Sequence, residues 1–484
     1  MKTLKRVIIS ALVFVFATGV FAGCKGTEKT VDERNVWVDG NKVYKDTYEG
    51  KEIIKIDFFD TGYGKDWLYE TAKDFVYENE EYALVLNADS SLVSTMPTKL
   101  ETGKNLSDIY FTPHFDWEKY ISQDCILPLD DVYEAKPDGE DGKTIEEKME
   151  PSYIETNRFE QNGEEHYYVL PWTKLITGIA YNSELFERYD IEVPKTMEEF
   201  DEVCETIIEK STAEGKRIAP FVASGRTLGY FDFMCMNLWI QRSGLDAIKE
   251  FFAFGDVEVF NPAKEPYKGY VSAWKDFAKY FGPDGFSKYC LSGSMSKEVY
   301  DAQRDLINGE AAMMINADWL EREMINLVDE TGFKMKLMQF PFVSDAKKDE
   351  NGNYISVNYG ADANFIFIPK KASNPEGAKE FLIFMHKENS LQTFTKVTGS
   401  FRPFEYDVES LRSELSAFSN SVLDISLACS ETYVDYPTGP RRFKASKFIT
   451  GQPNQMIING TDPEDFAAQE YAEAKVRWNS DWAV

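Results

Sequence analysis

The sequence predicts an α/β protein built from two domains. Between residues 53 and 111, strand-like runs alternate with helix-like stretches, which is typical of a parallel sheet covered by helices. The chain has 484 residues. That length is too great for one simple core, so it favours two domains.

The first strand and helix follow one another closely. Residues 53–59 form a β-rich run, and residues 60–64 have the composition of a turn. Apolar residues then recur at helical spacing: Leu68, Ala72, Phe75 and Val76. Residues 82–86 and 108–111 supply the next two strands.

Several later helices carry recognisable start signals. Thr196 and Glu199 have the spacing of a capping box. The pairs at 374–375 and 462–463 each place a proline after a capping residue, and proline suits the first turn of a helix. We therefore expect helices to begin at these three places, the second of them after a strand over residues 365–368.

Residues 1–23 have the features of a secretory signal. Three basic residues precede an apolar run over residues 7–20, which is shorter than the roughly 20 residues that span a bilayer. The segment resembles a bacterial lipobox that ends at Cys24, with Phe21 where that motif usually carries Leu. Acylation of Cys24 would anchor the chain at the outer face of a membrane. An ordinary signal peptide with an incidental cysteine is the alternative.

Residues 24–50 are expected to form a tether and a small hairpin. The run over 25–34 is polar and charged. Residues 36–44 alternate around Asp39-Gly40, a pair that favours a type I′ turn. We interpret this hairpin as a decoration that precedes the main fold.

Charge and cysteine usage exclude several classes of function. The formal net charge of −29 makes a basic nucleic-acid-binding surface improbable. The six cysteines include no Cys-x-x-Cys pair, so neither a zinc ribbon nor a redox motif is indicated, and those after Cys24 are expected to be buried free thiols. The three histidines are far apart in the chain. We expect no metal and no cofactor.

Three blocks of the chain carry short motifs in a fixed order. Residues 168–200 contain a Pro-Trp pair, a Tyr-Asn strand end and the helix start Pro-Lys-Thr-x-x-Glu-Phe. Residues 306–319 are LINGEAAMMINADW, and residues 360–403 supply a strand, a helix and a closing segment at 399–403. In order and spacing these blocks resemble the extracellular solute-binding proteins of ABC sugar importers, the family that includes maltose-binding protein.

The resemblance implies the two-lobe, type II fold of periplasmic binding proteins, with a hinge that the chain crosses several times. By position, lobe 1 would comprise residues 51–173 and 360–400, and lobe 2 residues 174–359 and 401–484. A ligand would lie in the cleft between the lobes. Ligand binding would then stabilise the closed form by contacting both lobes.

The resemblance also implies a binding protein and not an enzyme. The protein would capture a carbohydrate, with an oligosaccharide as the expected ligand, and deliver it to the permease subunits of an ABC importer. We expect a lipid-anchored monomer. Two alternatives stay open. A secreted lipoprotein glycoside hydrolase would need two carboxyl groups about 5 Å apart or somewhat further. A ligand-sensing subunit would use the same fold to signal through a membrane partner.

A sugar-binding cleft needs aromatic platforms for the flat C–H faces of the sugar and polar groups for its hydroxyls. By resemblance, Trp172 and Trp319 match aromatic or ligand-facing positions, and burial in the core is their alternative. Asp318 could accept hydrogen bonds from sugar hydroxyls or could cap the helix that follows it.

The remaining candidates lie in strand-end loops or at expected hinge crossings, and each has a structural alternative. Those in loops or at a helix start could instead shape the turn or pack in the core: Asp60, Tyr63, His114, Tyr230 and Phe231. Those near the hinge are Asp362, Asn364, Arg402 and Lys174. The two cations among them could equally form structural ion pairs.

Two acidic stretches look like calcium loops. If Gly352 in the stretch 345–353 is aligned with the turn glycine of an EF-hand, Lys347 falls at the first calcium-ligand position, so the stretch does not fit an EF-hand. The pair Asn351-Gly352 is instead explained as a hairpin turn. The stretch 138–142 lacks the downstream spacing. Neither is predicted to bind metal.

Overall fold

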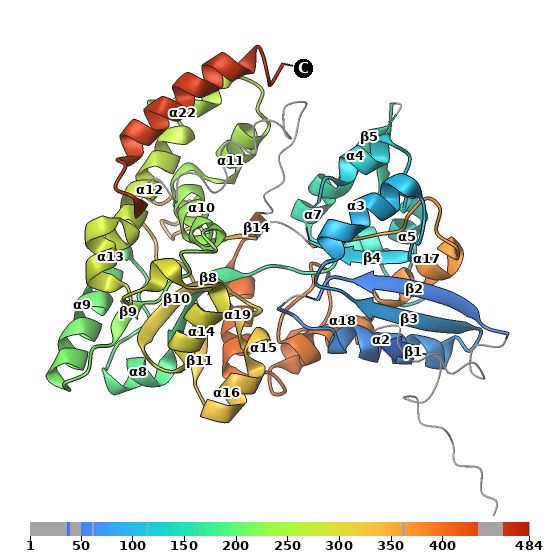
Figure 1. Cartoon of the computed structure of the whole chain (residues 1–484), viewed down its shortest axis with the longest axis horizontal. Coiled ribbons are helices and arrows are strands. Elements are labelled where there is room, and N and C mark those ends of the chain that lie inside the picture. The colour runs from blue at the N-terminus through green and yellow to red at the C-terminus, as the bar shows by residue number, and fades with distance from the viewer. Residues whose placement is uncertain are drawn as a thin grey trace, which may run out of the picture.

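The computed structural model shows two α/β lobes joined by several segments of the chain (Figure 1). Lobe 1 is built on a six-stranded sheet and lobe 2 on a four-stranded sheet. The predicted α/β fold with two lobes is therefore confirmed. The structure describes residues 36–38, 50–60, 62–113, 115–161, 163–360, 364–433 and 458–483.

The sheet of lobe 1 is mixed. Its strands are β1 (Val36–Val38), β2 (Glu52–Phe58), β3 (Tyr82–Ala88), β4 (Ile109–Thr112), β7 (Leu170–Pro171) and β13 (Phe365–Phe367). The order is β1-β3-β2-β4-β13-β7, in which the first four strands are parallel and β13 is antiparallel to both of its neighbours. Lobe 1 is thus completed by a strand that the chain adds only after it has built most of lobe 2.

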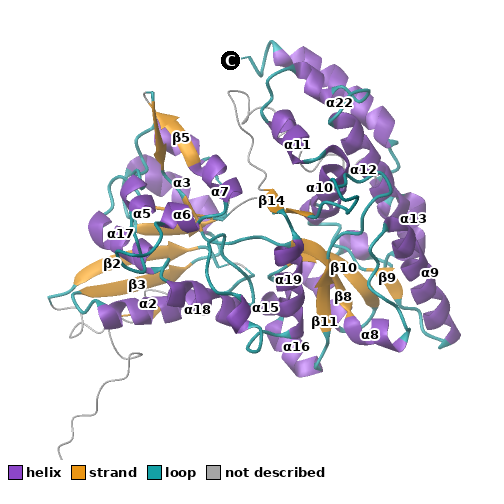
Figure 2. Cartoon of the chain, turned by 180° about the vertical axis from the view of Figure 1, so that it is seen from behind, coloured by secondary structure: helices purple, strands orange, loops and turns teal. Residues whose placement is uncertain are grey.

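Helices lie on both sides of this sheet (Figures 1 and 2). The helices of lobe 1 are α2 (Asp66–Glu78), α3 (Leu92–Thr102), α4 (Trp117–Ser122), α5 (Asp130–Glu134), α6 (Ile145–Lys148), α7 (Pro151–Asn157), α17 (Pro375–Phe384) and α18 (Glu388–Thr398). α2 and α18 pack together on one side, and α3, α4 and α5 lie on the other. A hairpin of β5 (Arg158–Gln161) and β6 (Glu164–Tyr167) completes the lobe.

The β2–α2 unit forms as the sequence predicts. β2 ends at Phe58, and Gly64 in the following loop has φ +66°, which glycine adopts without a Cβ clash. All four apolar residues expected on the inner face of the helix are buried: Leu68, Ala72, Phe75 and Val76. The loop between β2 and α2 is therefore held at the carboxyl end of β2.

Residues 36–38, expected as one strand of a separate hairpin, instead pair with the sheet of lobe 1. β1 pairs in parallel with β3, with Val36 opposite Leu84 and Val38 opposite Leu86. The unpaired edge of β3 offers backbone donors and acceptors to any extended segment nearby. The decoration prediction is wrong for residues 36–38. The expected turn at Asp39-Gly40 lies outside the described residues.

Lobe 2 is built around a buried central strand. Its strands are β8 (Thr177–Asn182), β9 (Ala219–Phe221), β10 (Ala311–Ala317) and β11 (Met335–Met338), in the order β11-β8-β10-β9. β8 is antiparallel to both neighbours, and β10 is parallel to β9. Every residue of β10 is buried. This strand explains the apolar run in the sequence around Met313.

The helices of lobe 2 surround this sheet and extend above it (Figure 2). They are α8 (Ser183–Arg188), α9 (Met197–Ala213), α10 (Gly229–Ser243), α11 (Leu245–Phe252), α12 (Tyr267–Phe281), α13 (Pro283–Tyr289), α14 (Val299–Ile307), α15 (Leu320–Glu323), α16 (Ile325–Thr331), α19 (Ala417–Ala428) and α22 (Pro463–Trp478). Short 3-10 turns occur at Val257–Phe260, Ser294–Ser296 and Glu409–Leu411.

The predicted helix starts are confirmed. Thr196 and Glu199 make both hydrogen bonds of a capping box at α9. Asn374 caps α17 and Asp462 caps α22, each through its side-chain oxygen and each followed by proline. These signals act through neighbouring backbone groups, so they can be predicted without knowledge of the tertiary fold.

The chain crosses between the lobes near residues 172–176, 359–365 and 398–401. At the junction, β12 (Val357–Tyr359) and β14 (Glu431–Tyr433) form a parallel pair. Phe401 packs against lobe 2 but Phe404 packs again in the core of lobe 1, so the chain leaves lobe 1 a few residues beyond the expected limit at 400. The hinge is thus made of several extended segments.

The cysteines that the structure describes are free. Cys204, Cys235 and Cys290 are buried, as predicted, and Cys125 and Cys429 are half-buried. Burial raises the pKa of the Cys235 and Cys290 thiols well above the usual range.

No helix among the described residues is long and apolar enough to cross a membrane. The expected signal over residues 1–23 and Cys24 lie outside the described residues.

The stretch 345–353 forms a turn, as predicted. Gly352 has φ +83°, and Lys348 and Tyr354 bridge in an antiparallel pair. The carboxylate of Asp349 accepts the backbone N–H groups of Asn351 and Asn353. Its oxygens are therefore occupied by the turn itself.

Candidate functional site

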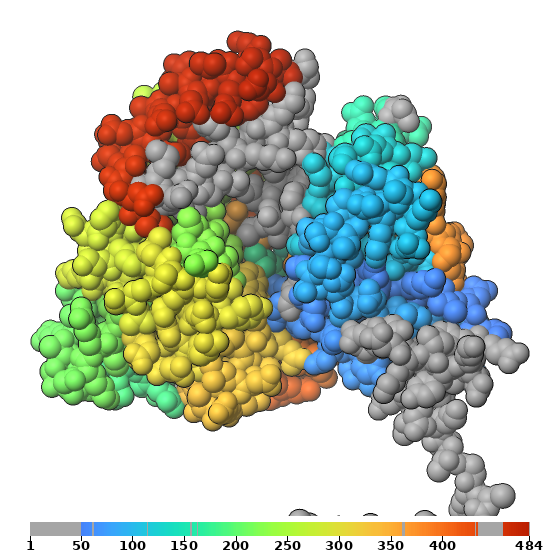
Figure 3. Space-filling model, in the orientation of Figure 1, coloured from blue at the N-terminus to red at the C-terminus, as the bar shows by residue number. Residues whose placement is uncertain are grey.

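The two lobes touch where the loop after β2 meets the turn after β10. The Tyr63 hydroxyl donates to the Asp318 carboxylate at 3.2 Å, and Arg322 pairs with Asp66 across the same contact. A Cβ on Gly62 would lie 2.8 Å from Trp319 Cδ1, so only glycine fits there without a shift. We call this contact the seam. Figure 3 shows lobe 1, largely blue and cyan, on the right and lobe 2, largely green, yellow and red, on the left.

Trp319 is the central aromatic residue of the seam. It is half-buried and packs against the cores of both lobes. Its ring lies 6.1 Å from that of Tyr63 in lobe 1 and 6.0 Å from that of Tyr230 in lobe 2, edge-on in both cases. Burial raises the pKa of the Tyr230 phenol, and a hydrogen bond with Trp319 lowers it in part. Ligand contact at Trp319 and Tyr230 stays a prediction.

Trp172 does not reach the seam. It is fully buried in lobe 1, stacked on Trp67 with ring centroids 5.4 Å apart, and its edge contacts Tyr63. Its backbone N–H donates to the carbonyl of Asn364, which points the side chain into the aromatic core. The core alternative therefore describes Trp172 in this structure. It supports the seam from behind, through Tyr63.

Asp318 lies at the hinge and not on an open surface. Its carboxylate is almost fully buried and accepts the Tyr63 hydroxyl and the Ile176 backbone N–H, the latter at 3.3 Å. It does not cap α15, whose N-cap is Trp319. Burial raises the pKa of Asp318 to about 7, against the opposing effect of its hydrogen bonds. This carboxyl joins lobe 1 to the first hinge segment.

The two expected cations of the hinge are engaged internally. Lys174 forms an ion pair with Glu150 at 2.5 Å. Arg402 is buried and donates to the carbonyl of Met385 and to His386 Nε2, so it contacts no open cleft. Lys174 therefore follows its structural alternative, an ion pair, whereas Arg402 is held by these two hydrogen bonds instead. The His386 imidazole is neutral in this arrangement, because its Nε2 accepts from Arg402 while its Nδ1 donates to the Leu382 carbonyl.

The other predicted residues are divided among core, hinge and seam. Phe231 is buried and packs edge-on or tilted against the rings of Phe277 and Phe281 on α12, so its core alternative applies. The Asn364 amide donates to Thr173 Oγ1 at 2.8 Å and so joins two hinge crossings. Asp60 is exposed at the start of the loop after β2. His114 and Asp362 lie outside the described residues.

Three residues of lobe 2 that the sequence did not single out complete the seam. Tyr300 on α14 is 53% exposed, and burial together with the Glu323 and Asp60 carboxylates raises its pKa. The Gln303 amide donates to Glu323 Oε2 at 2.6 Å. In sequence, Tyr300 and Gln303 occupy an ordinary amphipathic helix and Glu323 a charged turn. Only the tertiary fold brings Tyr300 and Gln303 to Glu323, and Glu323 to the loop of lobe 1 that also contacts Trp319.

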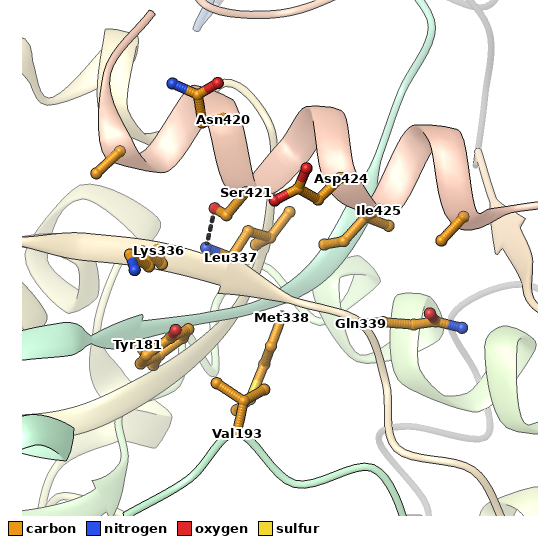
Figure 4. Close-up of a pocket in the computed structure, with 12 residues that line it drawn as sticks. Tyr181, Val193, Lys336, Leu337, Met338, Gln339, Asn420, Ser421, Asp424 and Ile425 are labelled. Carbon is orange, nitrogen blue, oxygen red and sulfur yellow. Dashed lines mark hydrogen bonds between the residues drawn. The ribbon is translucent and has the colours of Figure 1, made fainter. Parts of the chain in front are cut away.

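A separate pocket lies on lobe 2 between β11 and α19 (Figure 4). Its volume is about 500 Å³, and Lys336, Met338, Asn420 and Asp424 are among the residues that line it. Ser421 caps the edge of β11 there by accepting the Leu337 N–H. None of the predicted ligand contacts lines this pocket. The seam, and not this pocket, is therefore the candidate site.

The chain matches the family model of the bacterial extracellular solute-binding proteins over residues 61–388. It belongs to this family. An uncharacterized ABC transporter extracellular-binding protein of Pyrococcus horikoshii is 23% identical over 60% of the chain, and the match spans 56% of that protein. The diacetylchitobiose binding protein NgcE of Streptomyces coelicolor is 21% identical over 81% of the chain and 79% of its own length.

Solved structures show the same fold. The GacH receptor of Streptomyces glaucescens, known unliganded and in complex with acarbose, superposes with a TM-score of 0.64 at 16% identity and covers 90% of this chain and 100% of its own. At this identity the likeness establishes the fold of the solute-binding protein. It agrees with the two lobes and the hinge described above.

The Asp318 carboxyl should make stability depend on pH. Its pKa is about 7 in the folded protein and 3.8 without burial. At pH values between these two pKa values the folded state binds more protons than the unfolded state. The free energy of unfolding of the wild type should therefore rise relative to that of Asp318→Asn as the pH falls from 8 to 5. The rise should be at most roughly 1.4 kcal/mol per pH unit. Urea unfolding of both proteins across this range measures the difference. A constant difference would contradict the buried, titrating carboxyl.

His386 should have the opposite effect. Burial and the Arg402 guanidinium lower the pKa of His386 well below 6.5. Below about pH 6.5 the unfolded state therefore binds the proton first, and stability falls as the pH decreases. His386→Gln, which keeps an acceptor for Arg402, should lose this dependence while Asp318 remains intact. Unfolding at pH 7.5, 6.5 and 5.5 tests it, and equal slopes in both proteins would count against it.

Proposed function

We propose that the protein is an extracytoplasmic, lipid-anchored solute-binding protein that captures a carbohydrate, expected to be an oligosaccharide, for an ABC importer. The observation that carries the proposal is the seam, where Trp319 lies between Tyr63 of lobe 1 and Tyr230 of lobe 2. The polar side chain of Glu323, which Gln303 holds, approaches the same loop of lobe 1. Aromatic faces and nearby hydrogen-bonding groups are what a sugar site requires.

The relatives support the same ligand class. One of them is named for diacetylchitobiose binding, and the GacH receptor is known in complex with acarbose. A hydrolase has no comparable support, because the family to which the chain belongs consists of binding proteins. Separation of the lobes at the hinge would open the seam to a ligand, and closure would let the permease distinguish loaded from empty protein.

The membrane anchor is a separate part of the proposal. It rests on the apolar run at residues 7–20 and on Cys24, which together have the pattern of a lipoprotein signal. A diacylglycerol on Cys24 would supply two chains, enough for stable attachment. The permease partner and the extracytoplasmic location follow from this anchor and from the family.

A ligand screen tests the proposed function. A sugar that binds only the folded protein stabilises it by mass action, so one class of oligosaccharide should raise the thermal midpoint. Sugars, sugar alcohols and amino acids would be compared by differential scanning fluorimetry, with chromatography of the sugar after incubation. A shift with amino acids alone would contradict the carbohydrate ligand, and released monosaccharide would contradict a binding protein.

Replacement of the two tryptophans should have different effects. Trp319→Ala removes the aromatic face of the seam and should weaken binding of the stabilising sugar about 10- to 100-fold. Trp172→Ala removes a fully buried ring and should cost about 3–5 kcal/mol of folding stability. Isothermal titration and urea unfolding measure the two effects. Unchanged affinity in Trp319→Ala would remove this residue from the site.

A further inference from the structure

The seam contains a buried side-chain amide whose oxygen accepts no hydrogen bond from the described residues. Gln303 on α14 is completely buried, and its amide nitrogen donates to Glu323 Oε2 at 2.6 Å. Its amide oxygen Oε1 has no hydrogen-bond donor among the described residues. A buried acceptor without a donor costs free energy, so a group that brings an N–H or O–H to this place would be favoured.

The surroundings of Glu323 are those of a contact between lobes. A Cβ on Gly62 in lobe 1 would lie 3.2 Å from Glu323 Oε1, so the loop after β2 covers this carboxylate in the present structure. Burial raises the pKa of Glu323, and hydrogen bonds from Gln303 and Tyr300 oppose that effect. Separation of the lobes would uncover the carboxylate to a ligand, and a bound ligand would hold the Gly62 loop further from Glu323 than it lies here.

The charges at this point favour a ligand that donates hydrogen bonds. The phenol of Tyr300 lies within the electrostatic influence of two carboxylates, Glu323 from lobe 2 and Asp60 from lobe 1. The neighbouring cation, Arg322, is paired with Asp66. A ligand carboxylate placed here would be repelled, whereas hydroxyl or amino groups would be attracted.

We propose that Glu323, held by Gln303 beside the exposed ring of Tyr300, is a specificity-determining ligand contact that accepts hydrogen bonds from a neutral or amino sugar and disfavours acidic sugars. The inference rests on the proposed function, because it concerns the ligand of the same cleft. Tyr300 offers its ring to one face of the sugar, and the Glu323–Gln303 pair accepts from the polar rim of the sugar.

The test compares disaccharides that differ in charge. The probes are N,N′-diacetylchitobiose, its de-N-acetylated amino form, cellobiose and digalacturonate, titrated calorimetrically into the full chain. Wild-type protein should bind at least one neutral or amino disaccharide at least tenfold more tightly than digalacturonate. Glu323→Gln keeps the size of the side chain but removes its charge, and should weaken the favoured disaccharide about tenfold.

Two further variants make the result decisive. Glu321→Gln changes a carboxylate of the same short helix that faces Ser416 on lobe 2 instead of the seam, and should bind as the wild type does. Tyr300→Ala removes an exposed side chain, so it should fold normally and lose affinity severalfold. It therefore serves as the test if Glu323→Gln does not fold.

Tightest binding of digalacturonate, or wild-type affinity in both Glu323→Gln and Tyr300→Ala, would overturn the inference. Binding of none of the four probes, while another solute stabilises the protein, would also overturn it and leave the proposed function standing. If no solute in the wider screen stabilises the protein, the proposed function itself fails.

Discussion

The buried carboxyl of Asp318 is the interaction on which the arrangement of the lobes depends. It accepts hydrogen bonds from Tyr63 in lobe 1 and from Ile176 in the first hinge segment, while Ser400 in a later crossing donates to the backbone carbonyl of Asp318. A carboxyl group taken out of water is tolerated only if it is hydrogen-bonded or neutral. Asp318 thus joins three distant parts of the chain at the point about which the lobes would turn.

The position of the seam follows from this junction. Trp319 comes directly after Asp318, so its ring is fixed between the lobes, and the following helix brings Glu323 toward Gly62. Glycine at position 62 permits the close approach that any larger residue would prevent. A binding site made in this way is formed by both lobes, and each lobe alone supplies only part of its surface.

Local signals in the sequence predicted much of the fold, and tertiary contacts determined the rest. The caps at Thr196, Asn374 and Asp462 act within a few residues, so they were predictable. Burial of Trp172 depends on Trp67, Phe111 and Phe394, which are distant in sequence. The hairpin expected at residues 36–44 was inferred from local alternation alone, which could not reveal the free edge of β3. Tyr300, Gln303 and Glu323 had no distinguishing sequence pattern, because their role depends on the approach of lobe 1.

The pairing of β1 with β3 limits how far the protein could stand from a membrane. If Cys24 carries the lipid, only residues 25–35 separate the anchor from the first strand of the lobe 1 sheet. A fully extended peptide spans at most about 3.6 Å per residue, so the edge of lobe 1 would stay within about 40 Å of the bilayer surface. Lobe 1 would then be the lobe tethered to the membrane, and lobe 2 would be the lobe that moves relative to it when the cleft opens and closes.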